Sequence, residues 1–291
     1  MANKALVLGG KTGLLGQDIV EVLKKEGWEV IAPSREELNI FSSQELYSYI
    51  KDNEVDFVFN TIAYTQVEKA EEEPKKAFEL NKVFPKIVGN VCKELDVYLI
   101  HYSTDFVFDG QKETPYEDTD EPHPLNVYGQ TKLEGEKVLL EIPDLEVLII
   151  RTAWLFGRGK LNFVSKILNL AKNKSSLNVV HDQVGSPTYT LDLARYSLAL
   201  LHKKSTGIFH VVNAGQASWC ELAQEAVNCL GLACQIIPIS SKDFPQKAKR
   251  PAYSVLSINK FVQTTGIQPR SWIQALREYL YANFYGSGVN F

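Results

Sequence analysis

The sequence predicts an α/β protein in which a doubly wound parallel sheet is joined to a smaller second α/β lobe. Three observations support this class. Apolar runs alternate with amphipathic segments through the first half of the chain, a glycine-rich turn follows the first apolar run, and the rhythm of the segments changes after Gly157. Strands and helices that alternate in this way are typical of a parallel sheet covered by helices on both faces.

The first half contains five apolar runs that we expect to be buried strands. They occupy residues 4–8, 28–32, 55–59, 97–102 and 145–151. The segments between them have helical spacing, and helices are predicted at residues 14–25, 42–51, 74–94 and 127–140. Pro74 suits the first turn of its helix, because the N–H group that proline lacks would have no partner there.

The second half has a different organisation, with more frequent proline and glycine. Helices are predicted at residues 162–173, 190–204 and 219–230, and isolated strands at residues 177–180, 208–212 and 234–239. We therefore expect residues 1–157 to form one domain and residues 158–291 to form mainly a second lobe, with parts that return to the first domain. No internal repeat or low-complexity linker separates the two.

Bulk composition excludes several classes of protein. Of the 291 residues, 45% are hydrophobic and 23% are charged, as expected for a soluble globular protein with a large core. A net charge of −4 gives no electrostatic reason to expect nucleic acid or an anionic membrane as a partner. No apolar run approaches the roughly 18 to 20 residues that span a bilayer, and the N-terminal segment MANKALVLGGKTG fits a strand and turn better than a signal peptide.

The cysteines and histidines indicate a reducing compartment and no metal centre. The 4 cysteines include no CxxC pair, so we expect small buried side chains in a cytoplasmic protein. The 5 histidines form no HExxH or similar cluster. The sequence therefore predicts no metal site of its own.

The turn VLGGKTGLLG places Gly10, Gly13 and Gly16 between the first predicted strand and the first predicted helix. A dinucleotide pyrophosphate requires a backbone without intervening side chains and N–H groups from a helix N-terminus. An ordinary glycine-rich turn is the alternative, but its place in the first strand–helix unit favours a Rossmann-type cofactor site. The residues assigned to this site are Gly10, Lys11, Thr12, Gly13, Leu14, Leu15 and Gly16.

The end of the second predicted strand bears on which nicotinamide cofactor is used. An acidic residue there usually binds the ribose hydroxyls of NAD, whereas a nearby arginine accommodates the 2′-phosphate of NADP. Ser34 and Arg35 occupy this position, and the first acidic residue, Glu36, follows them. This order favours NADPH, with NADH as the alternative. A solvent-facing Arg35 without a ligand is the other interpretation.

Tyr128 and Lys132 lie four residues apart in a predicted helix and therefore share a face. An ammonium near a phenol is expected to lower the tyrosine pKa, and the phenol can then deliver a proton to a carbonyl oxygen. The lysine can also hold the nicotinamide ribose. Tyr47 and Lys51 have the same spacing, but we expect their helix to lie far from the cofactor end of a parallel sheet.

The fourth predicted strand delivers Ser103, Thr104 and Asp105 to that cofactor end. The Thr104 hydroxyl could bond the same substrate oxygen as Tyr128, which favours Tyr128 over Tyr47 as the functional tyrosine. The alternative is that Thr104 and Asp105 cap a loop, as threonine and aspartate often do.

With these motifs in order, the chain resembles the extended short-chain dehydrogenase/reductases and, within them, the family of dTDP-4-dehydrorhamnose reductases. The resemblance extends over nearly the whole chain. It rests on the segments GGKTGLLG, AYTQVEKAEEEP, HYSTDFVFDG, PLNVYGQTKLEGE, RTAWLFG, NFV, DQVGSPTYTLDLA and RPAYSVL. So many segments in the right order are far more specific than any single motif.

The resemblance implies NADPH- or NADH-dependent reduction of dTDP-4-dehydro-L-rhamnose to dTDP-L-rhamnose by a cytoplasmic enzyme with a substrate-binding second lobe. It implies Tyr128 as the proton donor, Lys132 as its pKa-lowering partner, and Thr104 and Asp105 as residues that orient the sugar. Further cofactor contacts are implied for Asn39, Ile40, Thr61, Ala63, Tyr64 and Tyr102. Substrate contacts are implied for Val67, Glu68, Phe106, Trp154, Asn162, Phe163 and Arg250, with Trp154 against the hexose, Asn162 and Phe163 bordering the nucleotide, and Arg250 on the diphosphate.

Some positions depart from the usual family pattern: Glu68 and Asn39 stand where aspartate is common, and Phe106 stands where tyrosine is common. Some members of the family are Mg²⁺-dependent dimers, but this sequence indicates no Mg²⁺ site and leaves monomer and homodimer open. A nucleotide-sugar dehydratase is disfavoured, because it would carry a glutamate in place of Phe106. A reductase or epimerase acting on another deoxysugar, and a non-catalytic NADP-binding regulatory subunit, remain alternatives.

Overall fold

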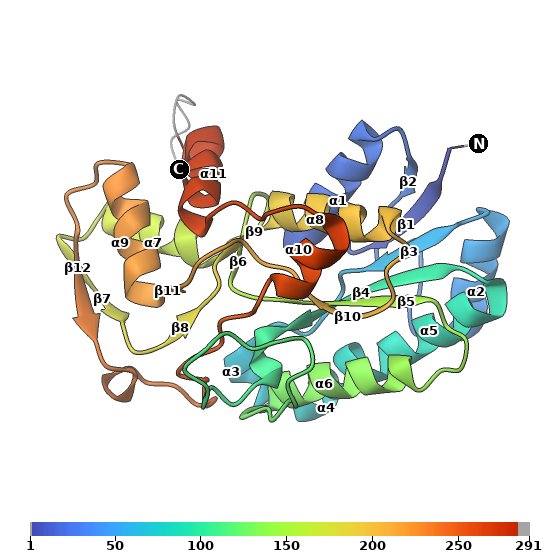
Figure 1. Ribbon diagram of the computed structural model, residues 1–291, viewed down its shortest axis with the longest axis horizontal. Coiled ribbons are helices and arrows are strands. Elements are labelled where there is room, and N and C mark those ends of the chain that lie inside the picture. Colours follow the sequence, from blue (N-terminus) through green and yellow to red (C-terminus); the bar gives the residue numbers. More distant parts are fainter. Residues whose placement is uncertain (1, 285–291) are drawn as a thin grey trace.

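The computed structural model describes residues 2–284 and confirms the predicted fold class. Six strands form one parallel sheet in the order β10-β5-β4-β3-β1-β2 (Figure 1). Their bounds are β1 Lys4–Leu8, β2 Glu29–Ile31, β3 Phe57–Asn60, β4 Tyr98–Thr104, β5 Val147–Thr152 and β10 Gly207–His210. The five strands predicted in the first half are all present, each within two residues of its expected bounds.

Helices cover both faces of this sheet (Figure 1). One face is covered by α1 (Leu14–Lys25) and α8 (Thr190–His202), and the other by α2 (Ser43–Asp52), α5 (Phe84–Leu95) and α6 (Val127–Leu140). Alternation along the strands supplies both cores. Leu148 and Ile150 of β5 pack on the α1 and α8 side, whereas Ile149 packs on the other side. The central strands β4 and β5 are thus buried on both faces along their whole length, as is usual in a parallel sheet covered by helices on both sides.

The helix predicted at residues 74–94 is interrupted. It consists of α4 (Pro74–Phe78), a π-helical turn η1 (Glu79–Val83) and α5. A short helix, α3 (Val67–Ala70), precedes it. The π-helical turn buries Asn81 completely, and π-helical turns of this kind occur frequently at functional sites.

The second lobe lies to the left in Figure 1 and is built from helices and short strand pairs. Its helices are α7 (Phe163–Ala171), α9 (Trp219–Cys229) and α11 (Trp272–Phe284). Its strand pairs are β7 (Ser176–Val180) with β12 (Gln235–Ile239), β8 (Val184–Gly185) with β11 (Ala217–Ser218), and β6 (Leu155–Phe156) with β9 (Thr188–Tyr189). The remaining elements are two 3₁₀ turns, η2 (Asp105–Val107) and η3 (Ser241–Asp243), and α10 (Asn259–Thr265).

The second half of the chain also contributes to the large sheet. The run predicted as an isolated strand at residues 208–212 contains β10, which pairs with β5 at the sheet edge. The helix α8 packs against α1 in the same core cluster. Parts of the second half therefore belong to the six-stranded sheet and its helix layer. The domain border at residue 157 stays a prediction.

The strand order places a ligand crevice at a definite point. β1 pairs with β2 on one side and with β3 on the other, so the connections from these neighbouring strands leave the sheet in different directions. In open α/β sheets, ligands bind at such a switch point, beyond the carboxyl ends of the strands. The strands β1, β3 and β4 all end at this edge, and the segments that follow them begin there.

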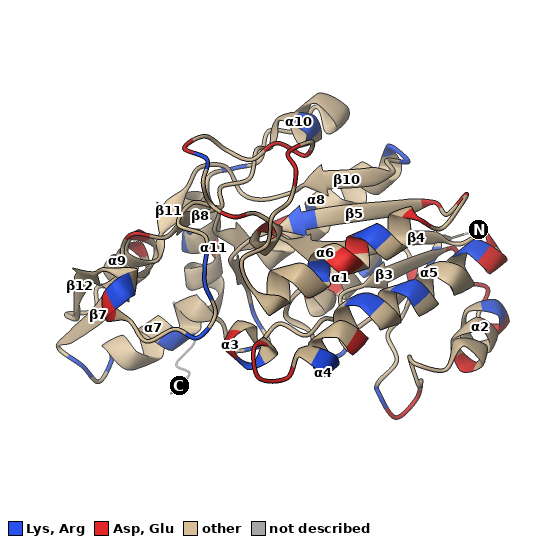
Figure 2. Cartoon of the chain, turned by 90° about the horizontal axis from the view of Figure 1, so that it is seen from below, with Lys and Arg blue, Asp and Glu red and all other residues tan. Residues whose placement is uncertain are grey.

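Charged residues are mixed on the face shown in Figure 2. Basic and acidic residues are interspersed along α2, α4, α5 and α6. Among residues 2–284, none of the helices combines the length and the apolar character that a membrane span requires.

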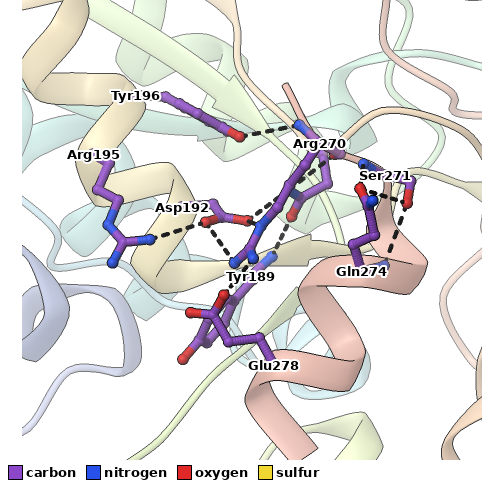
Figure 3. A network of polar contacts seen from close by, with 9 residues as sticks. Tyr189, Asp192, Arg195, Tyr196, Arg270, Ser271, Gln274 and Glu278 are labelled. Atoms are coloured by element: carbon purple, nitrogen blue, oxygen red, sulfur yellow. Dashed lines mark hydrogen bonds and ion pairs between the residues drawn. The ribbon is translucent and has the colours of Figure 1, made fainter. Parts of the chain in front are cut away.

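A partly buried ion pair joins the segment just before α11 to α8 (Figure 3). Arg270 donates to both carboxylate oxygens of Asp192, at 2.7 and 2.9 Å, and also bonds Glu278 of α11. The Asp192 carboxylate accepts a further hydrogen bond from Asn213 at 2.8 Å, and the Tyr196 hydroxyl accepts one from the Arg270 backbone N–H at 3.2 Å. The Asp192 side chain is only 3% exposed, so this carboxylate depends on its partners.

We expect Asp192→Ala to lower the free energy of unfolding by about 2–3 kcal/mol, since it leaves a partly buried guanidinium without its main partner. The matched control is Glu225→Ala, which removes the partner of the more exposed Arg277 (62% exposed) and should change stability by less than about 1 kcal/mol. Urea denaturation of both variants measures the difference. Similar losses in the two variants would contradict this account of the network.

Candidate active site

The glycine turn connects β1 to α1 at the carboxyl edge of the sheet. Its tightest point is Gly9, whose φ of +88° lies in the left-handed region. The Gly9 carbonyl oxygen accepts a hydrogen bond from the Gly13 N–H at 2.8 Å, and a Cβ on Gly13 or Gly16 would collide with that oxygen. Gly13 is the N-cap of α1 and offers no capping side chain. The first N–H groups of α1 therefore suit a pyrophosphate, and the turn fits a dinucleotide.

The seven residues of this turn that the sequence assigns to the cofactor differ in exposure. Lys11 and Thr12 are exposed, Gly13 and Leu14 are half-buried, and Gly10, Leu15 and Gly16 are buried. Leu15 belongs to the core cluster that α1 shares with the sheet, so any contact of this residue with a cofactor is through its backbone. A Cβ on Gly10 would lie 2.8 Å from both Ala32 and Val20. Gly10 therefore permits the close packing of the turn against the end of β2.

The predicted adenosine residues follow β2. Arg35 and Asn39 are exposed, and Ser34 and Ile40 are half-buried. The Asn39 side-chain oxygen accepts a hydrogen bond from the Phe41 N–H at 3.2 Å, and Ile40 packs against the core on the α2 side. Arg35 therefore supplies an exposed cationic residue at this tip.

The loop after β3 lies beside the glycine turn. The Thr61 hydroxyl donates to the Leu8 carbonyl oxygen at 2.7 Å, which ties this loop to the end of β1. Ala63 is half-buried. Tyr64 is buried, and its hydroxyl donates to Glu73 at 2.7 Å. The Tyr64 side chain thus serves the fold, while the backbone from Thr61 to Ala63 borders the crevice.

Helix α6 carries Tyr128 close to the end of β4. A Cβ on Gly129 would collide with the Phe106 carbonyl oxygen, and a Cβ on Gly135 would collide with the Asn81 carbonyl oxygen. These two glycines let the helix approach the neighbouring backbone more closely than any other residue would allow. The Tyr128 ring packs edge-on against Phe106, with ring centroids 5.7 Å apart.

Thr104 and Asp105 form one hydrogen-bonded group at this point. The Thr104 hydroxyl donates to Asp105 at 3.1 Å and accepts from the Phe106 N–H at 3.2 Å. Ser254, from the second half of the chain, donates to the other Asp105 oxygen at 2.6 Å. Burial raises the pKa of Asp105 to about 6, although the hydrogen bonds from Ser254 and Thr104 oppose the rise.

The pKa of Tyr128 differs from the sequence-based expectation, which was a lowering by Lys132. It is raised to about 12, mainly by burial and further by the Asp105 charge, while the Thr104 hydroxyl opposes the rise. The expected lowering is therefore wrong for the protein by itself. The physical reason is that the low-polarity surroundings disfavour the phenolate, and the Lys132 ammonium is directed to other partners.

Those partners lie on β4. Lys132 is buried and donates to the Tyr102 carbonyl oxygen at 2.6 Å, with its nitrogen 3.4 Å from His101 Nε2. Burial lowers the pKa of Lys132 to about 8, and the charge of nearby Glu136 acts in the opposite direction. The Tyr102 side chain points away into the core, where its hydroxyl donates to Ser197 at 2.9 Å. Tyr102 can therefore serve this site only through its backbone.

Trp154 lies just beyond β5, at the junction with the second lobe. Its φ of +46° is left-handed, which is uncommon for a large side chain and typical of functional sites. The indole stacks on Trp219 with centroids 3.5 Å apart and planes 4° apart, and a Cβ on Gly185 would collide with it. Phe163 packs against Trp219 at 4.6 Å. Trp154 is thus rigidly held but half-buried, with part of its surface open.

Glu68 and Arg250, both predicted substrate residues, contact each other. Their side chains form an ion pair at 2.5 Å, and Glu68 also accepts from the Lys247 N–H at 2.7 Å. Glu68 thereby fixes the loop that carries Arg250. Val67, at the start of α3, is half-buried beside it.

Asn162 is the N-cap of α7 and stabilises the start of this helix. It is buried, its side-chain oxygen caps α7 by accepting from the Ser165 N–H at 3.2 Å, and its amide donates to the Gly157 carbonyl oxygen at 2.8 Å. Both ends of its amide are therefore used within the fold.

The second Tyr–Lys pair with the same spacing lies in a different helix. Tyr47 and Lys51 lie on α2, where the Lys51 nitrogen is 5.6 Å from the Tyr47 ring centroid and the lysine is exposed. Tyr128 and Lys132, in contrast, meet Thr104 and His101 at the end of β4. Within residues 2–284, no three His, Cys, Asp or Glu side chains are grouped so that they could hold a metal ion.

The geometry has counterparts among known proteins. A sequence model of one family, described as the RmlD substrate binding domain, matches residues 4–284. The chain belongs to this family. The resemblance inferred from the motifs is therefore confirmed.

Relatives of this family match almost end to end. The dTDP-4-dehydrorhamnose reductase of Aggregatibacter actinomycetemcomitans is 36% identical over 94% of this chain and 97% of its own. The dTDP-4-keto-6-deoxy-D-glucose reductase of Streptomyces niveus is 33% identical over 96% of both chains. The structure of dTDP-4-dehydrorhamnose reductase from Bacillus anthracis str. Ames, in complex with NADP, is 30% identical and has a TM-score of 0.93 over 97% of this chain and 100% of its own.

Some residues that shape this RmlD-family site were missed from the sequence. Asn81 accepts from the Tyr64 N–H at 2.8 Å and donates to Thr131 at 2.9 Å, and Thr131 donates to the Tyr128 carbonyl oxygen at 2.9 Å. Asn81 thus positions the turn that carries Tyr128. Its π-helical turn has no sequence signal, because residues 74–94 have ordinary helical spacing.

A buried ion pair beneath Lys132 was also missed. Arg151 of β5 donates to Glu136 of α6 through two nitrogens, at 2.7 to 3.2 Å, and Ser103 donates to the same carboxylate. The Arg151 and Glu136 side chains are 2% and 1% exposed. An acid and a base on one helix and one strand were visible in the sequence, but their pairing depends on the tertiary fold.

The pKa of Asp105 gives a stability prediction. Because this pKa is about 6 in the folded protein and about 4 in an unfolded chain, ionisation between these values weakens folding as the pH rises. Asp105→Asn cannot ionise. Its free energy of unfolding, relative to the unchanged protein, should therefore rise by about 2–3 kcal/mol between pH 4 and pH 7. Urea denaturation across this range measures the difference, and a pH-independent difference would contradict the assignment.

Proposed function

We propose that the chain is an NADPH-dependent dTDP-4-dehydrorhamnose reductase that converts dTDP-4-dehydro-L-rhamnose to dTDP-L-rhamnose, with NADH as an alternative reductant. The observation that carries the proposal is the convergence of Tyr128, Thr104 and Lys132 at the end of β4, on the sheet edge from which the glycine turn also leaves β1. Full-length similarity to a curated reductase and to a reductase bound to NADP supports both the reaction and the cofactor.

Tyr128 suits the role of proton donor. NADPH supplies a hydride when it is bound. Reduction of a carbonyl also requires a proton on the carbonyl oxygen, and a phenol with a pKa of about 12 remains protonated at neutral pH. We assign the Thr104 hydroxyl, which opposes the rise of that pKa through its hydrogen bond to Tyr128, to the same carbonyl oxygen. Asp105 orients Thr104 through their hydrogen bond.

Lys132 has a separate part in the proposal. Its ammonium is held by the Tyr102 carbonyl oxygen, and a pKa of about 8 keeps it mostly protonated at neutral pH. We assign it to the ribose hydroxyls of the nicotinamide half, and to the return of protons to Tyr128 through those hydroxyls.

The second lobe supplies the proposed substrate contacts. The open part of the Trp154 indole offers a flat surface to the CH face of a hexose, and Trp219 holds it in place. Arg250 is assigned to the diphosphate, because its planar guanidinium matches phosphate oxygens. Its ion pair with Glu68 of α3 holds it in place. Phe106 and Val67 are assigned to the sugar side, and Phe163 to the nucleotide. Asn162 is assigned an indirect part, through the position of α7.

A reductase acting on another nucleotide deoxysugar is the second candidate. The relative from Streptomyces niveus, named for a different 4-keto sugar, is 33% identical to this chain. An epimerase would share the same residues. A dehydratase is disfavoured, since Phe106 packs on Tyr128 and carries no proton to transfer. A non-catalytic NADP-binding subunit would bind cofactor without turnover.

We assign the reaction to the cytoplasm. The 4 cysteines are all free thiols, and Cys92 and Cys234 are buried, as suits a reducing compartment. Monomer and homodimer are both compatible with this proposal.

The direct test is an assay of purified protein with NADPH or NADH and a panel of enzymatically prepared 4-keto nucleotide sugars. We expect oxidation of NADPH with dTDP-4-dehydro-L-rhamnose and formation of dTDP-L-rhamnose, because the family and the proton-donor geometry both favour this reaction. Turnover with another sugar alone would select the second candidate. Binding of cofactor without any turnover would refute the reductase assignment.

The role of Tyr128 can be tested by removing one oxygen atom. Tyr128→Phe should lower kcat by roughly two to four orders of magnitude, since the proton donor is lost, while the dissociation constant of NADPH changes little. Tyr47→Phe is the matched control, because it removes the same atom from the same Tyr–Lys spacing on α2. Comparable losses of kcat in both variants would show that the wrong tyrosine has been chosen.

A further inference from the structure

The carboxylate of Glu37 lies at the tip of β2, on two donors that come from different parts of the cofactor site. One oxygen, Oε2, accepts from Lys11 Nζ at 2.6 Å and from the Ser34 backbone N–H at 2.6 Å. Lys11 belongs to the glycine turn and Ser34 to the segment after β2. These two hydrogen bonds lower the pKa of Glu37 to about 2, because they favour the charged carboxylate.

The position of these donors coincides with the expected place of the adenosine ribose. In this type of fold the pyrophosphate lies on the glycine turn, and the ribose hydroxyls or the 2′-phosphate lie at the tip of the second strand. Lys11 and Ser34 reach the same oxygen atom from those two places. Arg35, which is exposed, follows Ser34 directly. A cation and a backbone N–H are therefore gathered where a 2′-phosphate would bind, and Arg35 is the next residue of the chain.

Local structure explains only half of this arrangement. The spacing of Ser34 and Glu37 matches a capping box, in which a glutamate three residues on reaches back to a backbone N–H, and the Glu37 N–H also donates to the Ser34 carbonyl oxygen at 3.2 Å. The contact with Lys11 has no such local cause, because the two residues are 26 positions apart.

We propose that Glu37 acts as an internal anion that occupies the donors of the 2′-phosphate and thereby sets the preference between NADPH and NADH. It competes with the 2′-phosphate of NADPH for Lys11 and Ser34. For NADH it supplies an acceptor for the ribose 2′-hydroxyl. The inference rests on the nicotinamide cofactor of the proposed function, and it identifies a specificity-determining residue that the order of Ser34, Arg35 and Glu36 in the sequence does not reveal.

The test compares two neutral substitutions of neighbouring acids. Glu37→Gln removes the charge but keeps the local bond to the Ser34 N–H, because glutamine also serves in capping boxes. Glu36→Gln removes the same charge from an exposed neighbour that, in the described part of the chain, accepts from neither Lys11 nor Ser34. Dissociation constants for NADPH and NADH are measured by titration calorimetry, and 2′,5′-ADP and 5′-ADP are used as probes that lack nicotinamide.

We expect Glu37→Gln to tighten the binding of NADPH and 2′,5′-ADP by about three- to fivefold, the upper part of the range for exposed charge interactions. NADH and 5′-ADP should bind as before or more weakly. Glu36→Gln should change all four constants by no more than about twofold, and the gain in Glu37→Gln should shrink as salt is added. In a Lys11→Met background the gain should be smaller, because Lys11 is one of the donors that the substitution releases.

Several results would overturn the inference. These are an unchanged NADPH constant in Glu37→Gln, an equal gain for NADH, an equal effect of Glu36→Gln, or no binding of NADPH by the unchanged protein. The measurements need no turnover, so they are separate from the test of the reductase reaction. A protein that reduces no sugar but shows the expected shift would retain this inference, and an active reductase without the shift would lose it alone.

Discussion

The candidate site depends on the close approach of α6 to the end of β4. Gly129 faces the Phe106 carbonyl oxygen and Gly135 faces the Asn81 carbonyl oxygen at distances that no side chain would tolerate. This contact brings Tyr128 against Phe106 and directs Lys132 to the Tyr102 carbonyl oxygen. Because interiors are close-packed, a larger residue at either glycine would move the phenol, the ammonium and their hydrogen-bond partners together.

A buried ion pair, Glu136–Arg151, supports the approach of α6 to β4. The Glu136–Arg151 pair lies between α6 and β5 and receives a third hydrogen bond from Ser103. Removal of either partner of a buried ion pair is strongly destabilising, because the remaining charge is left uncompensated, so this pair favours the arrangement that keeps α6 and β5 together. His101, whose pKa is held well below its ordinary value by burial and by the Lys132 charge, is neutral. A neutral His101 adds no second positive charge next to Lys132. Burial lowers the pKa of Lys132 to about 8, and the Tyr102 carbonyl oxygen holds its ammonium in place.

Local periodicity explains why the fold class, the five strands of the first half and α6 could be predicted from the sequence. The convergence of Tyr128 with Thr104 also followed from the rule that parallel strands end at one edge. Tertiary effects set the rest. The pairing of β10 with β5 joins segments about 60 residues apart in sequence, the π-helical turn at Asn81 lies within an ordinary helical pattern, and burial outweighed the ammonium effect expected on the Tyr128 pKa. The roles of individual site residues stay predictions.

The tie between Arg270 and Asp192 has a consequence for biosynthesis. Helix α8 covers one face of the large sheet together with α1. The Arg270 guanidinium that neutralises its buried Asp192 carboxylate lies 78 positions further along the chain. Domains generally begin to fold while they emerge from the ribosome. In the nascent polypeptide, Asp192 in the first turn of α8 therefore has, among its ion pairs within residues 2–284, only the 3.6 Å pair with Arg195 of its own helix until the segment just before α11 is translated. Chains released before that point would be substrates for chaperones or proteases.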